Sequence, residues 1–289
     1  KGRNCVVLRV VFMTAFTYQL VITVTRPMLP LYAAKLGASE FNIGLLVATY
    51  AFFPMVFAIQ IGKMTDRIGN YYPSVCGTVG LVVGVSLPAF FPTMWALFVS
   101  QTIVGLSQIL INVSLQNIIG TSSTATNQDR NFSFFSLAVS MGWLIGPVVG
   151  GYLGDYFRFQ TVYLYTILFG LCAFGFALFL PRVRMAAYED GTVVETEQPA
   201  HAKGTFGLLW KRDVRVAMVT SALVLYSRDI FVAYFPIYAS SQGYTASIIG
   251  WIISIMGMAL VMIRLSLPRM ILLWGRMRVL FGSLVMGGV

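Results

Sequence analysis

The chain has 289 residues, of which 57% are hydrophobic and only 10% are charged, and its mean hydropathy is +0.78. So little polar material cannot cover a soluble globule of this length, which indicates an integral membrane protein. The formal charge of +10 does not indicate a nucleic-acid partner, because no basic stretch is interleaved with aromatic side chains in a polar context.

The apolar segments are long enough to cross a lipid bilayer, which takes about 20 residues as a helix. In chain order, the predicted spans are residues 10–32, 43–61, 73–91, 94–117, 131–153, 160–180, 214–238 and 248–267, and a ninth begins near Val279. Because the sequence stops within that ninth apolar segment and does not begin with Met, we expect it to be part of a longer protein. The predicted fold class is therefore an all-α polytopic membrane protein with about 8.5 transmembrane helices present.

The distribution of basic residues predicts the orientation in the membrane. If the N-terminus is cytoplasmic, the 20 basic residues lie on the cytoplasmic side except for Arg26, Lys35, Arg158 and Arg228. This is the positive-inside bias, and it favours a multi-pass protein of the plasma (inner) membrane. The three cysteines and the single histidine have no metal-ligand spacing, so neither a metal nor a cofactor is expected.

One long polar segment divides the chain. Residues 181–212 are predicted to form a cytoplasmic linker between a six-helix bundle, 1–180, and an incomplete second bundle, 213–289. The second bundle repeats the first without a gap at an offset of 206, which superposes Pro30 on Pro236 and Gly37 on Gly243. A six-helix unit repeated in parallel is how one large class of secondary transporters is built.

Two glycine motifs stand out in the first bundle. The sequence GKMTDRIG after the second span carries Gly62, Asp66, Arg67 and Gly69, and GWLIGPVVGG in the fifth span carries Gly142, Gly146, Pro147, Gly150 and Gly151. Glycines four residues apart let another helix approach closely, and the proline allows the helix to bend. The other interpretation of the second motif is an ordinary small-residue packing face.

Together with the repeat, these motifs resemble the major facilitator superfamily, and the fifth-span motif is similar to that of its drug/proton antiporters. The resemblance is incomplete, because residues 70–72 (NYY) replace the trailing basic residues of the loop motif. In addition, Gln101 stands four residues before Gly105, where these antiporters usually carry an arginine. This departure puts a proton-coupling scheme that depends on that arginine in doubt.

The resemblance implies a monomeric secondary transporter that exports a small organic solute or drug by alternating access, coupled to protons. An uptake carrier for a sugar, organic acid or peptide and a metallophore or siderophore exporter remain alternatives, as does a truncated protein that does not transport. The sequence contains no catalytic or nucleotide-binding motif, so we do not expect an enzyme.

Polar residues inside the spans are costly and mark the candidate substrate and ion pathway. These candidates are Gln19, Thr23 and Arg26 in the first span, Gln101, Gln108, Asn112 and Gln116 in the fourth, and Arg228 and Asp229 in the seventh. From the nearby aromatic residues, we select Tyr18 and Tyr226 rather than Tyr50, Trp143 or Trp251. The alternatives are hydrogen bonds between packed helices for the fourth span, and a static ion pair or snorkelling charges for the others.

The charge cluster predicts a specific pairing. Arg26 and Asp229 fall on symmetry-related faces of the first and seventh spans, so we expect Asp229 to form a cluster with Arg26 or Arg228 that binds substrate or a proton, or closes the outer gate. A second carboxylate, Asp66, is replaced by Leu272 in the repeat. We expect Asp66 to accept hydrogen bonds from a helix N-terminus or a basic side chain as a cytoplasmic latch.

Overall fold

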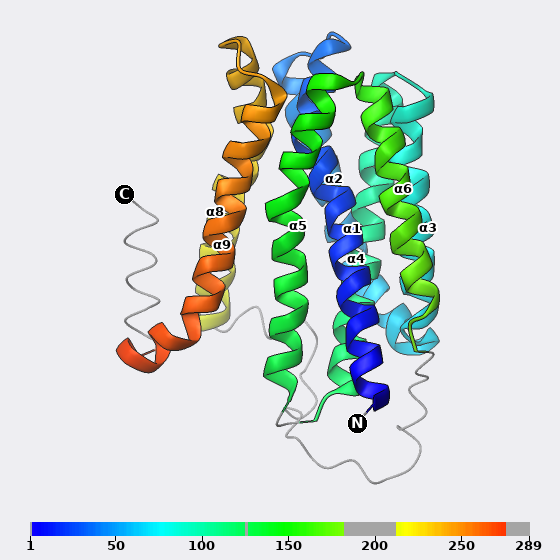
Figure 1. Cartoon of the computed structure of the whole chain (residues 1–289), viewed down its shortest axis with the longest axis vertical. Helices are drawn as coiled ribbons and strands as arrows, with labels where there is room; N and C mark the ends of the chain where they lie inside the picture. The colour runs from blue at the N-terminus through cyan, green and yellow to red at the C-terminus, as the bar shows by residue number, and fades with distance from the viewer. Residues whose placement is uncertain (1, 125–126, 182–211, 276–289) are drawn as a thin grey trace.

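The computed structural model describes residues 2–124, 127–181 and 212–275, and every regular element within these ranges is an α-helix. The helices, labelled in Figure 1, are α1 (Gly2–Lys35), α2 (Glu40–Ile68), α3 (Tyr71–Phe90), α4 (Met94–Ser122), α5 (Gln128–Tyr156), α6 (Phe159–Leu178), α8 (Arg212–Ser241) and α9 (Ala246–Trp274). The predicted ninth span and most of the predicted linker lie outside the described residues.

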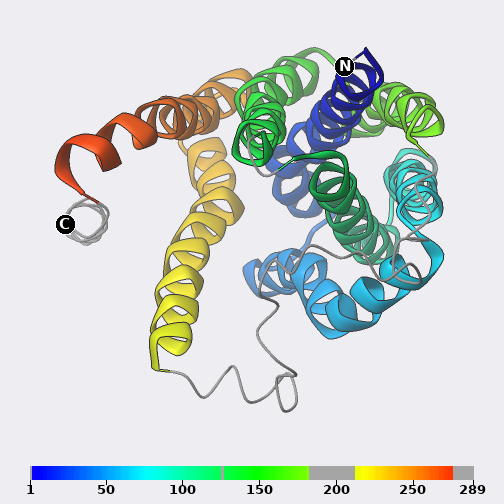
Figure 2. The ribbon, with the colours of Figure 1, turned by 90° about the horizontal axis from the view of Figure 1, so that it is seen from below.

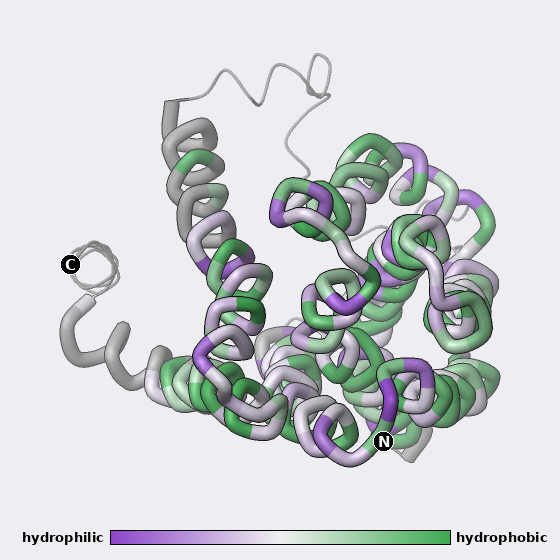
Figure 3. Tube along the Cα trace, turned by 90° about the horizontal axis from the view of Figure 1, so that it is seen from above, coloured by the Kyte–Doolittle hydropathy of each residue, from purple (hydrophilic) through white to green (hydrophobic). Residues whose placement is uncertain are grey.

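All but one of the described helices have the length and composition of membrane spans. Seven of those in the described ranges are long and apolar enough to cross a bilayer, and α8, which carries Arg228 and Asp229, is not among the seven. Hydrophobic residues occur along all the described helices (Figure 3), and large apolar side chains are exposed on the lateral surfaces, as on α2 at Phe52 and Met55. The prediction of an all-α polytopic membrane protein is confirmed.

Helix α1 occupies the middle of the bundle formed by α1 to α6. Its side chains Ala15, Tyr18, Val21 and Ile22 are buried in the main hydrophobic core, and α1 contacts α4, α5, α6 and α8. Helix α9 packs along α5, and both α8 and α9 tilt away from the bundle toward the end where the N-terminus lies (Figures 1 and 2). The two groups of helices are therefore closest at the opposite end, which we call the Asp155 end.

The turns of the two halves have the same backbone geometry. Gly37 and Gly243 have φ of 82° and 85°, and Gly69 and Gly275 have φ of 86° and 81°, so each pair matches at the offset of the internal repeat. Such positive φ values are strained for residues with a Cβ atom. The next helices begin alike, because Ser39 accepts from the Asn42 N–H at 3.3 Å and Thr245 accepts from the Ile248 N–H at 3.4 Å.

The motif after the second span lies within a helix rather than in a loop. Helix α2 continues to Ile68, past the predicted end of the span at residue 61, and ends where Gly69 adopts positive φ and donates its N–H to the carbonyl of Thr65 at 3.0 Å. Asp66 and Arg67 occupy the last turn and are exposed, and a Cβ atom at Gly62 would meet nothing within 4 Å. The latch role of Asp66 remains a prediction about another conformation.

Candidate functional site

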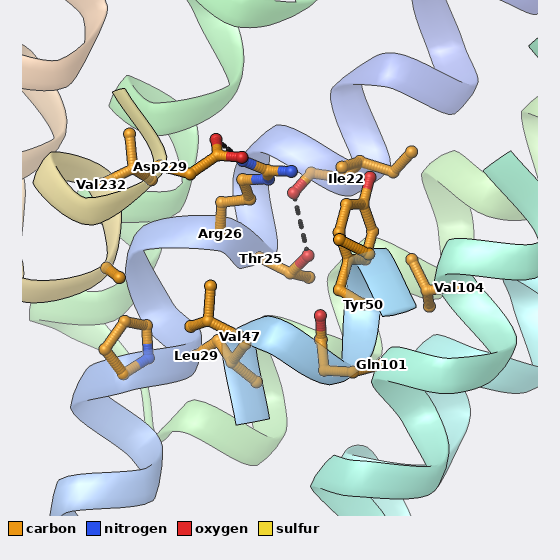
Figure 4. A pocket seen from close by; sticks show the side chains of 13 residues that line it. Ile22, Thr25, Arg26, Leu29, Val47, Tyr50, Gln101, Val104, Asp229 and Val232 are labelled. Carbon is orange, nitrogen blue, oxygen red and sulfur yellow. Dashed lines mark hydrogen bonds and ion pairs between the residues drawn. The ribbon is translucent and has the colours of Figure 1, made fainter. Parts of the chain in front are cut away.

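Three charged side chains meet where α1 faces α8. The Nη1 atom of Arg26 lies 3.1 Å from Oδ1 of Asp229, and Nη2 of Arg228 lies 3.1 Å from the same oxygen. Arg26 and Asp229 are 203 positions apart in sequence, and Figure 4 shows their side chains extending toward each other. The structure thus brings together the three charges that the repeat placed on facing helices.

Aromatic rings flank the two guanidinium groups. Trp143 of α5 contacts both of them, with its ring centre 5.2 Å from the Arg26 guanidinium carbon and 4.9 Å from that of Arg228. The ring centre of Tyr50 lies 4.8 Å from the Arg26 guanidinium carbon. A cation over an aromatic face gains about 0.5–2 kcal/mol, which offsets part of the roughly 2.5–3.5 kcal/mol that a charge costs near the centre of a membrane helix.

A small cavity lies beside the charges. Its volume is about 50 Å³, whereas drug-sized ligands occupy pockets of about 300–1,000 Å³ and one water takes about 30 Å³. The cavity is therefore closed to a drug-sized solute in this conformation. Figure 4 shows the side chains that line it, which are Ile22, Thr25, Arg26, Leu29, Pro30, Val47, Tyr50, Ala51, Gln101, Val104, Asp229, Val232 and Ala233.

The polar residues of α4 have different surroundings. Gln101 lines the cavity, but the carbonyl oxygen of Gln108 accepts a hydrogen bond from the Tyr50 hydroxyl. The Asn112 side chain accepts from the Tyr18 hydroxyl at 2.8 Å, and Gln116 is exposed. The predicted polar face of α4 thus includes two hydrogen bonds between packed helices, the alternative left open by the sequence, and only Gln101 lines the cavity.

The remaining candidates lie away from the cavity. Gln19 and Thr23 are buried, and the Thr23 hydroxyl bonds to the Gly142 carbonyl at 2.7 Å, which ties α1 to α5. Tyr18 is fully buried, whereas Tyr226 is 66% exposed and lines a lateral groove between α2 and α8. The aromatic residues that contact the charges are Tyr50 and Trp143, which sequence reasoning passed over although both had been noticed beside the polar lines.

The glycines of α5 serve two separate interfaces. On one face, a Cβ atom at Gly142 would lie 2.7 Å from Cγ of Gln19, and Cβ atoms at Gly146 and Gly150 would clash with Thr23 and with the Val24 carbonyl, respectively, all on α1. The motif therefore allows α5 to lie against the backbone of α1, as small residues allow between membrane helices.

The other face of α5 meets α9. A Cβ atom at Gly151 would clash with the carbonyl of Ala246, and one at Gly250 would clash with the carbonyl of Pro147. Further along, a Cβ atom at Gly257 would lie 2.7 Å from the carbonyl oxygen of Trp143. This contact joins the first six helices to the second set at near-backbone distance.

A carboxylate that sequence reasoning missed binds the start of α9. The oxygens of Asp155, in the last turn of α5, accept hydrogen bonds from the backbone N–H groups of Ala246 at 2.7 Å and Ser247 at 3.0 Å. Helix N-termini carry unpaired N–H groups and a partial positive charge, which a carboxylate stabilises. The first turn of α2 has its own acid, Glu40, at the position that matches Ala246 in the repeat, whereas α9 has none. The absence of an acid from the first turn of α9 is the sequence feature that could have indicated a carboxylate supplied by another helix.

No group of three or more His, Cys, Asp or Glu side chains within the described ranges is arranged to hold a metal ion. The charged groups that line the cavity are instead the guanidinium of Arg26 and the carboxylate of Asp229, and Arg228 binds the same carboxylate without lining the cavity. Such a set can bind an ion or exchange a proton, but it offers no nucleophile activated by a base.

Comparison with known proteins identifies the family. The sequence profile of the Major Facilitator Superfamily matches residues 11–289. Among curated relatives, an uncharacterized MFS-type transporter of Methanocaldococcus jannaschii is 26% identical over 164 residues, which are 57% of this chain and 42% of that protein. The quinolone resistance protein NorA of Staphylococcus aureus is 26% identical over 171 residues, 59% of this chain and 44% of that protein. The chain thus matches less than half of the length of these relatives.

Solved structures share the fold. A bacterial homologue of the human lysosomal transporter Spinster, in an inward-facing and unoccupied conformation, has a TM-score of 0.67 at 15% identity. The matched region covers 87% of this chain and 58% of the homologue's chain. The human organic anion transporter MFSD10 has a TM-score of 0.58 at 15% identity, and the matched region covers 90% of this chain and 71% of the MFSD10 chain. The relatives are named as transporters, in agreement with the prediction that the chain is not an enzyme. The chain belongs to the major facilitator superfamily of membrane transporters.

Proposed function

We propose that the protein is a secondary active transporter that exports a small organic solute from the cytoplasm by alternating access, coupled to protons. The observation that carries this proposal is the ion pair of Arg26 and Asp229, which bridges α1 and α8 beside a cavity at the interface of the two sets of helices. Substrate sites of transporters built from two repeats lie at that interface. The α5 glycine motif and the similarity to NorA, named for quinolone resistance, support export.

The proposed orientation gives the ion pair a role in the cycle. With the N-terminus on the cytoplasmic side of the plasma membrane, the Asp155 end faces outward, so the close α5–α9 contact shuts the outer side. Protonation of Asp229 would remove the charge that holds both guanidiniums and let α8 separate from α1. Loss of the proton would restore the pair. Among the described side chains, the other charged or ionisable groups beside Asp229 are Arg26, Arg228 and Tyr50.

Transport by the purified full-length protein tests the proposal. In proteoliposomes we expect an imposed pH gradient to drive accumulation of at least one member of a panel of fluorescent organic anions, zwitterions and cations. Expressing cells should accumulate less of the same compound than control cells. Accumulation of none of the panel under any gradient would contradict coupled transport, and greater accumulation in expressing cells would contradict export.

Asp155 is proposed to stabilise the outward-closed state. Replacing Asp155 with Asn leaves one acceptor oxygen, so one of the two hydrogen bonds is lost and the other becomes neutral. Because charged hydrogen bonds contribute about 1.5–3 kcal/mol against about 1 kcal/mol for neutral ones, we expect the outward-open population to rise several-fold. Spin labels at Phe91 and Gln242, which are exposed at the Asp155 end on opposite sets of helices, would report a longer distance.

The matched control for this variant is Glu40→Gln. Glu40 is the acid of the equivalent first turn in α2, so its loss removes a helix-terminal charge without touching the α5–α9 contact. An unchanged label distance in Asp155→Asn, or an equal change in both variants, would show that Asp155 does not act as a latch.

A further inference from the structure

We propose that the substrate of this site is an amphipathic organic anion, an inference that rests on the proposed transport function. The first observation is the local charge. Two guanidiniums, Arg26 and Arg228, share a single carboxylate oxygen of Asp229, so the cluster carries one net positive charge when all three groups are ionised. Protonation of Asp229 would leave two positive charges, and an anion would then compensate them.

The geometry of the guanidiniums suits an oxyanion. Each guanidinium has five N–H donors in a planar fork that matches the two oxygens of a carboxylate. Arg26 uses Nη1 for Asp229, and its guanidinium carbon lies 4.8 Å from the ring centre of Tyr50 and 5.2 Å from that of Trp143. With five N–H donors, the guanidinium can donate to an incoming anion while it keeps its bond to Asp229.

The acid content of the spans argues against a cationic substrate. Among the described residues, Asp229 is the one carboxylate that lines the cavity, and both arginines already engage it. A cation would have to compete with two adjacent guanidiniums for that carboxylate and would be repelled by both. The rest of the wall is largely apolar, with Ile22, Leu29 and Val104 facing the same space (Figure 4), which favours a substrate with an apolar body.

A second cavity of the same character lies at the N-terminal end of the bundle. It has a volume of about 580 Å³ and is lined by Arg9 and Arg130 together with Leu8, Phe12, Met13 and Phe134. With the proposed orientation, this cavity lies on the cytoplasmic side, where an exported solute enters. Two cations beside apolar side chains would attract an amphipathic anion there before it reaches Arg26.

Binding of two dyes that share a xanthene ring system separates the charge classes. In nanodiscs containing the full-length protein, fluorescence polarisation should show fluorescein, an anion at mildly alkaline pH, binding at least about tenfold more tightly than the cation rhodamine 123. Replacement of Asp229 with Asn should tighten fluorescein binding several-fold, because it removes the negative charge that competes with the dye for both guanidiniums. Replacement of Arg228 with Gln should weaken it about tenfold or more, and Arg228→Lys should weaken it less.

An arginine remote from the cavity provides the control. Arg158→Gln removes an exposed arginine at the start of α6 and should leave fluorescein binding unchanged. Tighter binding of rhodamine 123 that Asp229→Asn abolishes would overturn the anion assignment, as would failure of fluorescein to bind, or fluorescein binding that Asp229→Asn weakens or leaves unaltered. If rhodamine 123 were then accumulated under a pH gradient, the proposed transport function would stand although its substrate class was wrong.

Discussion

Replacement of Asp229 with Asn is expected to abolish pH-driven accumulation of substrate while exchange of substrate across the membrane continues. Asparagine resembles aspartate in shape and can still accept a hydrogen bond from Arg26, but it cannot bind and release a proton. The charge-assisted bonds to Arg26 and Arg228, both 3.1 Å long, would become neutral-acceptor bonds with about half the strength. We expect at least a tenfold loss of accumulation, which corresponds to about 1.4 kcal/mol, measured in proteoliposomes.

The separation of accumulation from exchange distinguishes coupling from folding. A variant that fails to fold loses both activities, whereas an uncoupled transporter loses only the uphill one. Arg158→Gln, remote from the cavity, is the control for a lost charge. Wild-type accumulation and pH dependence in Asp229→Asn would show that the ion pair is a static structural contact, which is the alternative that the sequence left open.

The same Gly→Ala substitution is expected to affect mainly stability at the α1–α5 interface and mainly gating at the α5–α9 interface. Gly150→Ala places a methyl group against the backbone of α1 at Val24, within the first six helices, and Gly250→Ala places one against Pro147, between the two sets. Overpacking costs about 1–3 kcal/mol. We expect Gly150→Ala to lower the thermal stability of the protein by several degrees, and Gly250→Ala to increase the outward-open population with a smaller loss of stability.

Gly175→Ala is the matched control, because a Cβ atom at Gly175 meets nothing within 4 Å. Thermal unfolding in detergent and label distances at the Asp155 end would measure the two effects. Equal stability of Gly150→Ala and Gly175→Ala would contradict the close α1–α5 contact. A closed distance distribution in Gly250→Ala like that of the wild type would contradict the gating role of the α5–α9 interface.

The sequence predicted the helices and the meeting of distant charges because both follow from periodic features. Membrane spans are defined by apolar length, and the repeat transfers the position of Thr23 onto Asp229, so Arg26 and Asp229 were expected on facing helices before any contact was known. The ends of helices were harder to predict. Helix α2 runs on to Ile68 because polar residues at the membrane surface continue a helix as readily as they end it, and only Gly69 stops it.

The aromatic and capping residues of the site depend on three-dimensional packing. Nothing in the spacing of Tyr50 and Trp143 distinguishes them from other membrane aromatics such as Tyr226, because their contact with Arg26 depends on how α1, α2 and α5 cross. Asp155 was missed for the same reason. Its role becomes apparent only when the end of α5 is placed beside the start of α9, a helix 91 positions away in sequence.

Protonation of Asp229 is proposed to control the contact between the two sets of helices. The distance between spin labels at Phe91 and Gln242, measured as a function of pH in the wild-type protein and in Asp229→Asn, tests this control. We expect the wild-type distance to lengthen as pH falls, and the variant to show the long distance at every pH. A wild-type distance that does not change with pH, or an Asp229→Asn variant that responds as the wild type does, would show that Asp229 does not control this contact.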